Sequence, residues 1–515
     1  MKINSLTIKD YKCLNNVTIN FDERATILLG ENGSGKSSII EAICKIFVEL
    51  EGHSRSSFDK MKYKIDYICN GHNIVVDYLS KEIKVKIDGK KSTLKFLREK
   101  GEREFSPYLP QKIITYYSGI ENKLENIVNK SLRFYKMRLT QSVNDVKKYS
   151  SATSTRRFYT IEHRLTGILL FSILADDNCE EKRILKDFIG LNGDVVLNLI
   201  VNEKNQIPKN KNLNLNIDAD VDFEKQMFFK LAARIDEDIA KILRRKWIKN
   251  WFHKQALLFK ISTKDFNGID KFRIYHFFET VLDYYYGFDY GFFVDFKGAN
   301  VLYQDLSEGQ RQLISVISMI AVFNQRDSLI LLDEPDTHLN AKWKHAYWEM
   351  LRDVTCQATD SQVLLATHDP LMVNGIKKEE VRLFEQDDKG NTKIYIPLED
   401  TFGMGIDGIL QSEYYGLLYT VDKSTQEKIN EKHNLMVKQK QGTLTRDEKE
   451  RLIELTTELE NLIFARNIPT DNYYDEYVAA MHKIYSERPK TKLTADDIAE
   501  RNAKAEEILR GLLVK

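Results

Sequence analysis

Residues 30–37 have the types and spacing that bind the phosphates of a nucleotide. They read GENGSGKS, which matches the pattern G-x-x-x-x-G-K-[ST] in full, directly after one apolar run and before another. In this pattern backbone N–H groups surround the phosphates, the lysine reaches the β and γ oxygens, and the last hydroxyl binds Mg²⁺. We therefore predict that the chain binds ATP and Mg²⁺, with Ser37 as a metal ligand. The predicted phosphate-binding residues are Asn32, Gly33, Ser34, Gly35, Lys36, Ser37 and Ser38.

A second set of candidate residues follows two apolar runs late in the chain. Residues 329–332 precede Asp333 and Glu334, and residues 363–367 precede His368. Asp333 suits the second protein ligand of Mg²⁺, and Glu334 suits the catalytic carboxylate that polarises the attacking water. His368 is predicted to donate a hydrogen bond to the γ-phosphate. Paired acids at a strand end are sometimes only a solvated turn, and a lone histidine is usually structural. Because these three residues directly follow predicted core strands, we prefer the catalytic interpretation.

Several motifs together resemble the head of ABC ATPases. They are GENGSGKS, LSEGQ (306–310), Asp333-Glu334, PDTHLN (335–340) and THD (367–369); IKDYKCLNNVTINF (8–21) and ILLGENGSGKSSIIEAI (27–43) narrow the resemblance to the RecF, SMC and OLD-like branch. The resemblance implies that Ser307 and Gly309 of one subunit cover ATP held by another, so that at least two subunits assemble head to tail. It also implies a phosphate contact for Lys12, although an arginine is commoner at that position.

The same resemblance places YYSG, residues 116–119, in the loop that senses Mg²⁺. That loop usually holds a glutamine, which this stretch lacks. Gln111 lies just upstream, so the glutamine's role stays open in the sequence.

The composition limits the classes of protein to consider. The chain has 515 residues, enough for two to four domains, and a formal net charge of +1, so a nucleic-acid or membrane surface can only be a local patch. Its five cysteines are scattered, which argues against disulfides and a zinc site. The longest apolar stretch, residues 165–175, is shorter than the about 20 residues that span a bilayer. With no signal peptide in view, we expect a cytoplasmic protein with no membrane contact.

The elements that must position these residues form an α/β pattern. Alternating apolar residues predict strands before the phosphate loop and a β meander over 62–97, and the run after the loop predicts a helix. We expect an ABC-type P-loop ATPase head that a helical insertion interrupts and a helical C-terminal region follows. The predicted parts are the first part of the head (1–119), a mainly helical insertion (120–285), the second part of the head (286–400), and a helical region for assembly or partner docking (401–515).

The long interval between the phosphate loop and LSEGQ narrows the choice within the branch. It is too long for a transporter ATPase and too short for the coiled coil of an SMC protein, and no acidic pairing of a Toprim nuclease follows residue 380. RRFYTIEHRLTGILLFSIL (156–174) and TFGMGIDGILQSEYYGL (401–417) resemble the PtuA-type ATPases of Septu anti-phage defence systems, which also occur beside some retrons. That resemblance implies a partner HNH nuclease similar to PtuB and an assembly larger than a dimer. In a retron it implies a reverse transcriptase and its multicopy single-stranded DNA.

The expected function is therefore slow ATP hydrolysis that controls a partner nuclease through nucleotide-dependent assembly. The chain has ten histidines and no His-Asn-His constellation of its own. One competing hypothesis is a RecF- or SMC-like repair ATPase that acts on DNA without a nuclease partner. Another is a scaffold that nucleotide locks, in which turnover matters little.

Two basic and aromatic stretches could bind single-stranded nucleic acid, through cations on phosphates and rings on bases. They are RRKWIKNWFHK (244–254) and RFYKMR (133–138). The plainer interpretation of the first is an amphipathic helix that buries Trp247, Trp251 and Phe252 and exposes its charges. We prefer this plainer interpretation.

The C-terminal region predicts a pair of helices with apolar residues at heptad-like spacing. Gly442 ends one helix, and Thr445 with Glu448 forms a capping box for the next. The leucines could pair within this hairpin, which we prefer, or with a partner subunit; they are Leu452, Leu455, Leu459 and Leu462. A final amphipathic helix from Thr494 is the segment we expect to dock a nuclease.

Overall fold

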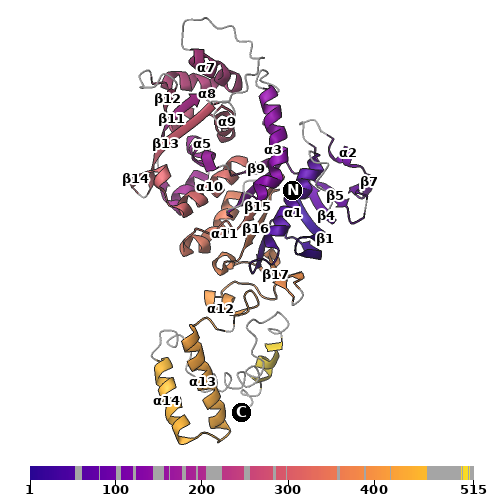
Figure 1. The fold of residues 1–515 in the computed structure, drawn as a ribbon, viewed down its shortest axis with the longest axis vertical. Helices are drawn as coiled ribbons and strands as arrows, with labels where there is room; N and C mark the ends of the chain where they lie inside the picture. Colours follow the sequence, from indigo (N-terminus) through magenta and orange to yellow (C-terminus); the bar gives the residue numbers. More distant parts are fainter. Residues whose placement is uncertain are drawn as a thin grey trace. The chain divides into compact units, whose positions relative to one another are not determined.

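The structure, a computed structural model, divides into two compact units (Figure 1). The first unit comprises Met1–Val373 and Glu379–Tyr395, and the second comprises Asn374–Lys378 and Ile396–Lys515. The structure describes residues 1–52, 61–80, 82–99, 106–119, 123–142, 156–161, 163–176, 181–192, 195–203, 223–248, 256–281, 286–296, 298–355, 360–387, 390–417, 419–460, 500–501, 503–508 and 510. Within these ranges no helix combines the length and the hydrophobicity needed to cross a membrane.

A seven-stranded sheet forms the centre of the first unit. Its order is β18-β17-β3-β16-β15-β8-β9, and all neighbours are parallel except β17 and β18. The strands are β3 (Ala25–Gly30), β8 (Lys112–Tyr117), β9 (Phe158–Thr160), β15 (Ser328–Asp333), β16 (Gln362–Thr367), β17 (Val381–Gln386) and β18 (Thr392–Tyr395). Every residue of β15 and β16 is buried, as expected for parallel strands covered on both faces.

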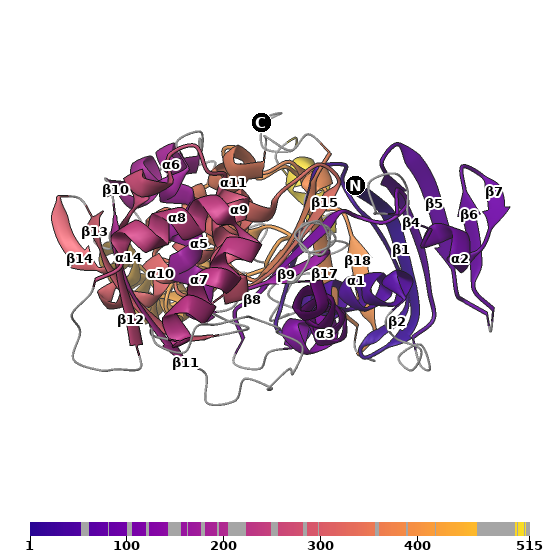
Figure 2. The same ribbon diagram turned by 90° about the horizontal axis from the view of Figure 1, so that it is seen from above.

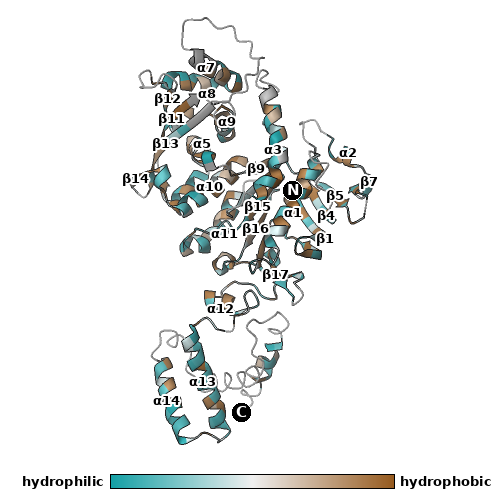
Figure 3. Ribbon diagram, viewed as in Figure 1, coloured by the Kyte–Doolittle hydropathy of each residue, from teal (hydrophilic) through white to brown (hydrophobic). Residues whose placement is uncertain are grey.

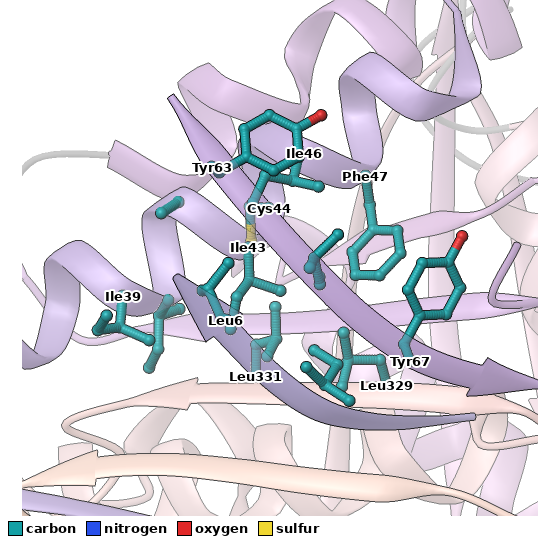
Figure 4. Close-up of a cluster of buried hydrophobic side chains, with 14 of the residues drawn as sticks. Leu6, Ile39, Ile43, Cys44, Ile46, Phe47, Tyr63, Tyr67, Leu329 and Leu331 are labelled. Carbon is teal, nitrogen blue, oxygen red and sulfur yellow. The ribbon is translucent and has the colours of Figure 1, made fainter. Parts of the chain in front are cut away.

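Helix α1 (Lys36–Glu51) lies between the central sheet and a second, antiparallel sheet. That sheet has the order β2-β1-β4-β5-β6-β7, with β1 (Lys2–Tyr11), β2 (Leu14–Asn20), β4 (Tyr63–Cys69), β5 (His72–Asp77), β6 (Lys84–Ile87) and β7 (Lys90–Ser92), followed by α2 (Leu94–Leu97). Figure 4 shows the shared core, in which Leu6, Ile43, Phe47, Tyr67 and Leu329 meet. Both the predicted meander and the predicted helix are confirmed.

Strands of the insertion and the strands that directly follow residue 285 form a sheet that the sequence analysis missed. Its order is β10-β13-β11-β12, with β14 pairing β13, and its strands are β10 (Leu191–Asn192), β11 (Val196–Glu203), β12 (Ala256–Ser262), β13 (Tyr286–Phe296) and β14 (Ala299–Leu302). The strand expected just before LSEGQ is β13, and it pairs with β11 instead of joining the central sheet. Aromatic packing holds it there, since Phe292 stacks on Tyr303 with ring centroids 4.8 Å apart.

Helices lie between this sheet of the insertion and the central sheet, and they cover the side of the central sheet away from α1 (Figures 1 and 2). They are α3 (Lys123–Ser142), α5 (Thr166–Ala175), α6 (Glu181–Ile184), α7 (Phe223–Ile235), α8 (Glu237–Lys246), α9 (Lys271–Phe278), α10 (Glu308–Phe323) and α11 (Ala341–Thr355). Helix α3 is the exception, because it packs on α1. The apolar stretch 165–175 forms α5, which is buried nearly all round and contacts α10. It is a core helix of the insertion.

A buried ionic network joins the central sheet to the insertion. The Arg156 guanidinium pairs with Glu279, and His276 Nδ1 lies 3.0 Å from the same carboxylate. Tyr159 of β9 reaches His276 Nε2 at 3.3 Å. Burial acts to raise the pKa of Glu279, but Arg156 and His276 outweigh it and hold that pKa at about 2. The network fixes helix α9 against the edge strand of the sheet.

The described part of the second unit contains a helical hairpin after a short connecting region, so the predicted hairpin is confirmed. Its helices are α12 (Ile406–Gln411), α13 (Lys423–Lys440) and α14 (Arg446–Glu460), with α13 packed on α14. Both are mainly hydrophilic (Figure 3), and Leu455 and Leu459 are buried. The Thr445 N–H donates to Glu448 at 2.9 Å, and the Glu448 N–H donates to Thr445 Oγ1 at 3.3 Å, as the capping box requires. Leu462 and most of 494–515 lie outside the described residues.

We predict that Glu49→Gln stabilises the protein at alkaline pH. Glu49 of α1 is 3% exposed, and burial raises the pKa of its carboxyl to about 9 against the pull of Arg98. Because the pKa of Glu49 is higher in the folded state, its carboxyl stabilises the fold fully below about pH 4.5. This contribution is lost as the pH rises towards 9. The variant therefore gains about 1–3 kcal/mol over wild type at pH 8 and almost nothing at pH 4.5. Urea denaturation at both pH values measures it.

The matched control is Glu23→Gln, on a side chain that is 82% exposed. An equal pH dependence in wild type and Glu49→Gln would contradict the assigned pKa.

Candidate functional site

The candidate residues meet where the central strands end. Strands β3, β15, β16 and β8 are parallel, so their carboxyl ends lie at one edge of the sheet. Asp333 pairs in register with Ala366 on one side and with Tyr117 on the other. The phosphate loop continues from β3, Glu334 follows β15, and His368 follows β16. One edge therefore holds every predicted catalytic residue.

The phosphate loop turns directly into helix α1. Gly35 precedes the helix with φ of 107°, a conformation that favours glycine, and a Cβ there would come within 2.8 Å of Leu14 Cδ2. The Lys36 Nζ donates to the carbonyls of Gly30 at 2.7 Å and Glu31 at 2.9 Å, which keeps the ammonium over the loop. Burial lowers the pKa of Lys36, and the carboxylates of Glu334 and Asp333 oppose that shift.

Ser37 and Asp333 form the predicted metal-binding pair. The Ser37 hydroxyl donates to Asp333 Oδ1 at 3.0 Å, although 296 residues separate them. Asp333 is 1% exposed, and its Oδ2 has no hydrogen-bond partner among the described residues. Burial raises the pKa of Asp333 to about 7. A hydroxyl and an unsatisfied carboxylate oxygen beside a phosphate loop suit Mg²⁺, which prefers oxygen ligands and takes few from the protein.

Glu334 and His368 form a second pair at the same edge. His368 Nδ1 lies 2.6 Å from Glu334 Oε2, and the histidine side chain is 50% exposed. Glu334 has φ of 52°, rare for a residue with a side chain, and its N–H donates to the Ala366 carbonyl at 2.9 Å. Such a conformation persists only where surrounding structure enforces it, and it commonly marks a functional site. Here the ladder with β16 enforces it.

The YYSG segment lies beside the catalytic edge, but Gln111 does not. The Ser118 N–H donates to the Asp333 carbonyl at 3.3 Å, and Thr337 Oγ1 lies 3.0 Å from Ser118 Oγ. The backbone N–H of Gln111 donates to the carbonyl of Asp327, which lies at the opposite end of β8 and β15. Five or six strand residues, about 20 Å, separate it from the catalytic edge. Gln111 is therefore excluded as the missing glutamine.

The LSEGQ segment opens helix α10. The Ser307 hydroxyl accepts from the Gln310 N–H, and the Gln310 side chain accepts from the Ser307 N–H at 2.8 Å, so the helix begins with a capping box. Gly309 packs so closely on residues 335–340 that a Cβ would lie 2.3 Å from the His338 carbonyl oxygen. Among the described residues, no hydrogen bond joins Ser307 or Gly309 to the phosphate loop.

Two further residues complete this side of the site, and the sequence analysis missed both. Gln312 donates to the Pro335 carbonyl at 2.9 Å and accepts from the His338 N–H at 3.3 Å. Asp336, 1% exposed, accepts from Thr367 Oγ1 at 3.2 Å, and burial raises its pKa to about 6. Gln312 follows Gly309 by three residues on one helix, which was the only signal in the sequence.

The Lys12 side chain contacts the helix that follows the phosphate loop. The residue occupies the turn between β1 and β2 with φ of 54°, and its Nζ pairs with Glu41 of α1 at 2.5 Å. The Tyr11 hydroxyl donates to the same carboxylate at 3.1 Å. Neither contact involves a phosphate-loop residue, so the phosphate role of Lys12 stays a prediction.

The structure departs from the expectation for the first of the two basic stretches. Helix α8 ends at Lys246, and Trp247 is extended with ψ of 135°, so the helix predicted through residue 254 is wrong at that end. The extended backbone lets Trp247 pair with Phe259 of β12. Trp251 and Phe252 lie outside the described residues. On α3, Tyr135 is buried and Phe134 and Met137 are 40% and 48% exposed.

Several known proteins are similar to this chain in sequence. Retron Vc95 probable ATPase of Vibrio cholerae serotype O1 biovar El Tor is 19% identical over 451 residues, 78% of this chain and 77% of that protein. Septu protein PtuA of Bacillus mycoides is 25% identical over 173 residues, 32% of this chain and 24% of that protein. DNA replication and repair protein RecF of Staphylococcus epidermidis is 25% identical over 180 residues, 31% and 44% of the two chains. The latter two matches cover less than half of those proteins.

The family match covers all the segments that form the catalytic edge. Residues 1–373 match the family described as AAA ATPase domain. That range contains the phosphate loop, the insertion, the LSEGQ helix and the residues from Asp333 to His368. The chain therefore belongs to the AAA ATPase domain family, and it is an ATPase similar to those of retron and Septu systems.

Proposed function

We propose that the chain hydrolyses ATP in the manner of an ABC-type head and thereby controls a nuclease partner in an anti-phage defence complex. The observation that carries the catalytic part is the pair of contacts at one sheet edge, Ser37 with Asp333 and Glu334 with His368. The first contact joins the phosphate loop to a carboxylate, and the second places a carboxylate beside a histidine at the same edge.

Each residue has one role in this proposal. Loop backbone N–H groups and Lys36 hold the phosphates, and Ser37 and Asp333 hold Mg²⁺, which when bound neutralises charge on the phosphate oxygens. Glu334 accepts a proton from the attacking water. His368, held by Glu334 at 2.6 Å, donates towards the γ-phosphate. We expect turnover to be slow.

Ser307 and Gly309 act on ATP held by a second subunit. Their helix is fastened to residues 335–340 by Gln312 and by the close approach at Gly309. Within the described residues neither Ser307 nor Gly309 forms a hydrogen bond to the phosphate loop of its own subunit, which supports action in trans. A head-to-tail dimer supplies both halves of each site, and the defence complex contains more than one dimer.

The proposed partner is a small HNH nuclease. The support is similarity to the Retron Vc95 probable ATPase over 78% of this chain and to the Septu protein PtuA over 32%. In a retron, a reverse transcriptase and its single-stranded DNA would join the complex. The competing function is DNA repair without a nuclease, which the RecF match over 31% of the chain favours.

Glu334→Gln is expected to bind ATP normally and to hydrolyse it 10²- to 10⁴-fold more slowly, because the amide cannot accept the proton of the water. Retained ATP should also strengthen association between heads. Phosphate release and light scattering with and without ATP measure the two effects. Glu349→Gln, on an exposed position of α11, is the matched control. Unchanged turnover and assembly would remove Glu334 from its proposed role.

Mixing two inactive variants tests action in trans. Lys36→Ala removes the phosphate-loop ammonium, and Ser307→Ala removes the hydroxyl proposed to act on ATP held by the partner subunit. In a mixed dimer one site carries both defects and the other carries neither. Random mixing makes about half of the dimers mixed, so about one quarter of all sites should be intact. ATPase activity of each variant alone and of the mixture measures it. A mixture as inactive as its components argues against shared sites.

Co-expression with neighbouring genes tests the partner. We expect an HNH nuclease to co-purify with the chain, and its retention to differ between Glu334→Gln with ATP and Lys36→Ala, because only the first holds the triphosphate. Size-exclusion chromatography of the complex measures retention. Neighbours without a nuclease, together with binding of duplex DNA by the purified chain alone, would favour the repair function.

A further inference from the structure

The outer side of the phosphate loop is held by the edge hairpin of the central sheet. Thr392 of β18 donates from Oγ1 to the Ser34 carbonyl at 3.0 Å, and it is 6% exposed. Gln386, the last residue of β17, donates from Nε2 to the Gly33 carbonyl at 3.0 Å. Strand β17 pairs with β3, with Phe384 opposite Gly30. The hairpin is thus in register with the start of the loop.

These two hydrogen bonds orient the N–H groups that a phosphate needs. In a trans peptide the carbonyl and the following N–H point in opposite directions. A Ser34 carbonyl that faces Thr392 therefore turns the Gly35 N–H to the other side, towards the interior of the loop. Gly33 and Gly35 have φ of 85° and 107°, and glycine can rotate out of such conformations easily. The threonine hydroxyl selects one orientation.

The same hairpin is connected to the second unit at both ends. Residues 374–378 precede it and residues 396–401 follow it. These two segments are joined to each other, because the Ile376 N–H donates to Thr401 Oγ1 at 2.8 Å and the Thr401 N–H donates to the Ile376 carbonyl at 3.1 Å. Thr401 is fully buried, and the Lys378 N–H donates to Asp400 Oδ1 at 2.8 Å. The two connections must therefore move together.

We propose that Thr392 is a positioning residue of the phosphate loop and that the β17–β18 hairpin transmits nucleotide occupancy to the second unit. This inference rests on the proposed ATP binding and adds its regulation. A shift of the loop on binding phosphate moves the hairpin, and the clamped segments at its base carry that movement into residues 396–417. Coupling of binding equilibria is reciprocal, so a protein bound to the second unit changes the affinity for ATP by the same factor.

Thr392→Val tests the positioning role, because valine keeps the shape and removes the donor. We expect ATP affinity, measured by calorimetry, to fall roughly tenfold, since the buried Ser34 carbonyl loses its partner. Affinity for adenosine, which has no phosphate, should be unchanged, and a merely structural defect would lower both. Thr392→Ser keeps the hydroxyl and should restore wild-type binding. Thr263→Val, the same change at a buried threonine of the insertion, is the matched control.

Amide exchange tests the transmission. In wild type, ATP should slow exchange at Ile376 and Thr401, and in Thr392→Val at saturating ATP this protection should largely disappear. Equal ATP affinities of wild type and Thr392→Val overturn the positioning role. Exchange that ATP leaves unchanged in saturated wild type overturns the transmission. A wild type that binds no ATP overturns the proposed function itself, which the calorimetry of wild type alone reveals.

Discussion

The parallel pairing of four buried strands is the constraint on which the site depends. Strands β3, β16, β15 and β8 share one direction, so the segments that leave their carboxyl ends must meet. Burial on both faces makes any slip in register costly, because a slip of one residue turns each side chain to the opposite face. Leu329 and Leu331 of β15 already lie in the core shared with α1. The Ser37–Asp333 contact is a consequence of that register.

Charge is concentrated at this edge and balanced from several elements. Three carboxylates, Asp333, Glu334 and Asp336, lie within four residues of one another, and two of them are almost fully buried. The opposing cations are Lys36 of α1 and Lys344 of α11, which pairs with Asp369. Burial raises the pKa values of Asp333 and Asp336 and lowers that of Lys36, so the site strongly favours an added cation and an added phosphate together.

The phosphate loop is supported on two sides by parts of the chain far from it in sequence. Leu14, in the first strands, packs where a side chain on Gly35 would stand, and Thr392 holds the carbonyl of Ser34. The LSEGQ helix is held instead by residues 335–340, through Gln312. The loop and the LSEGQ helix therefore have separate supports within one subunit. Such a division suits a site that two subunits complete together.

Local pattern in the sequence determined the phosphate loop, the paired acids, the meander and the C-terminal capping box, because each depends on residues a few positions apart. It also sufficed for an α/β head with an insertion. The β11–β13 sheet was not predicted, because its strands pair across long, charged intervals whose composition is typical of helix. The end of α8 at Lys246, the exclusion of Gln111, and the roles of Gln312, Asp336 and Thr392 were decided only by tertiary structure. The partners of Gln312, Asp336 and Thr392 lie 23 or more residues away in the sequence, and only the register of the folded sheets brings them within hydrogen-bond distance.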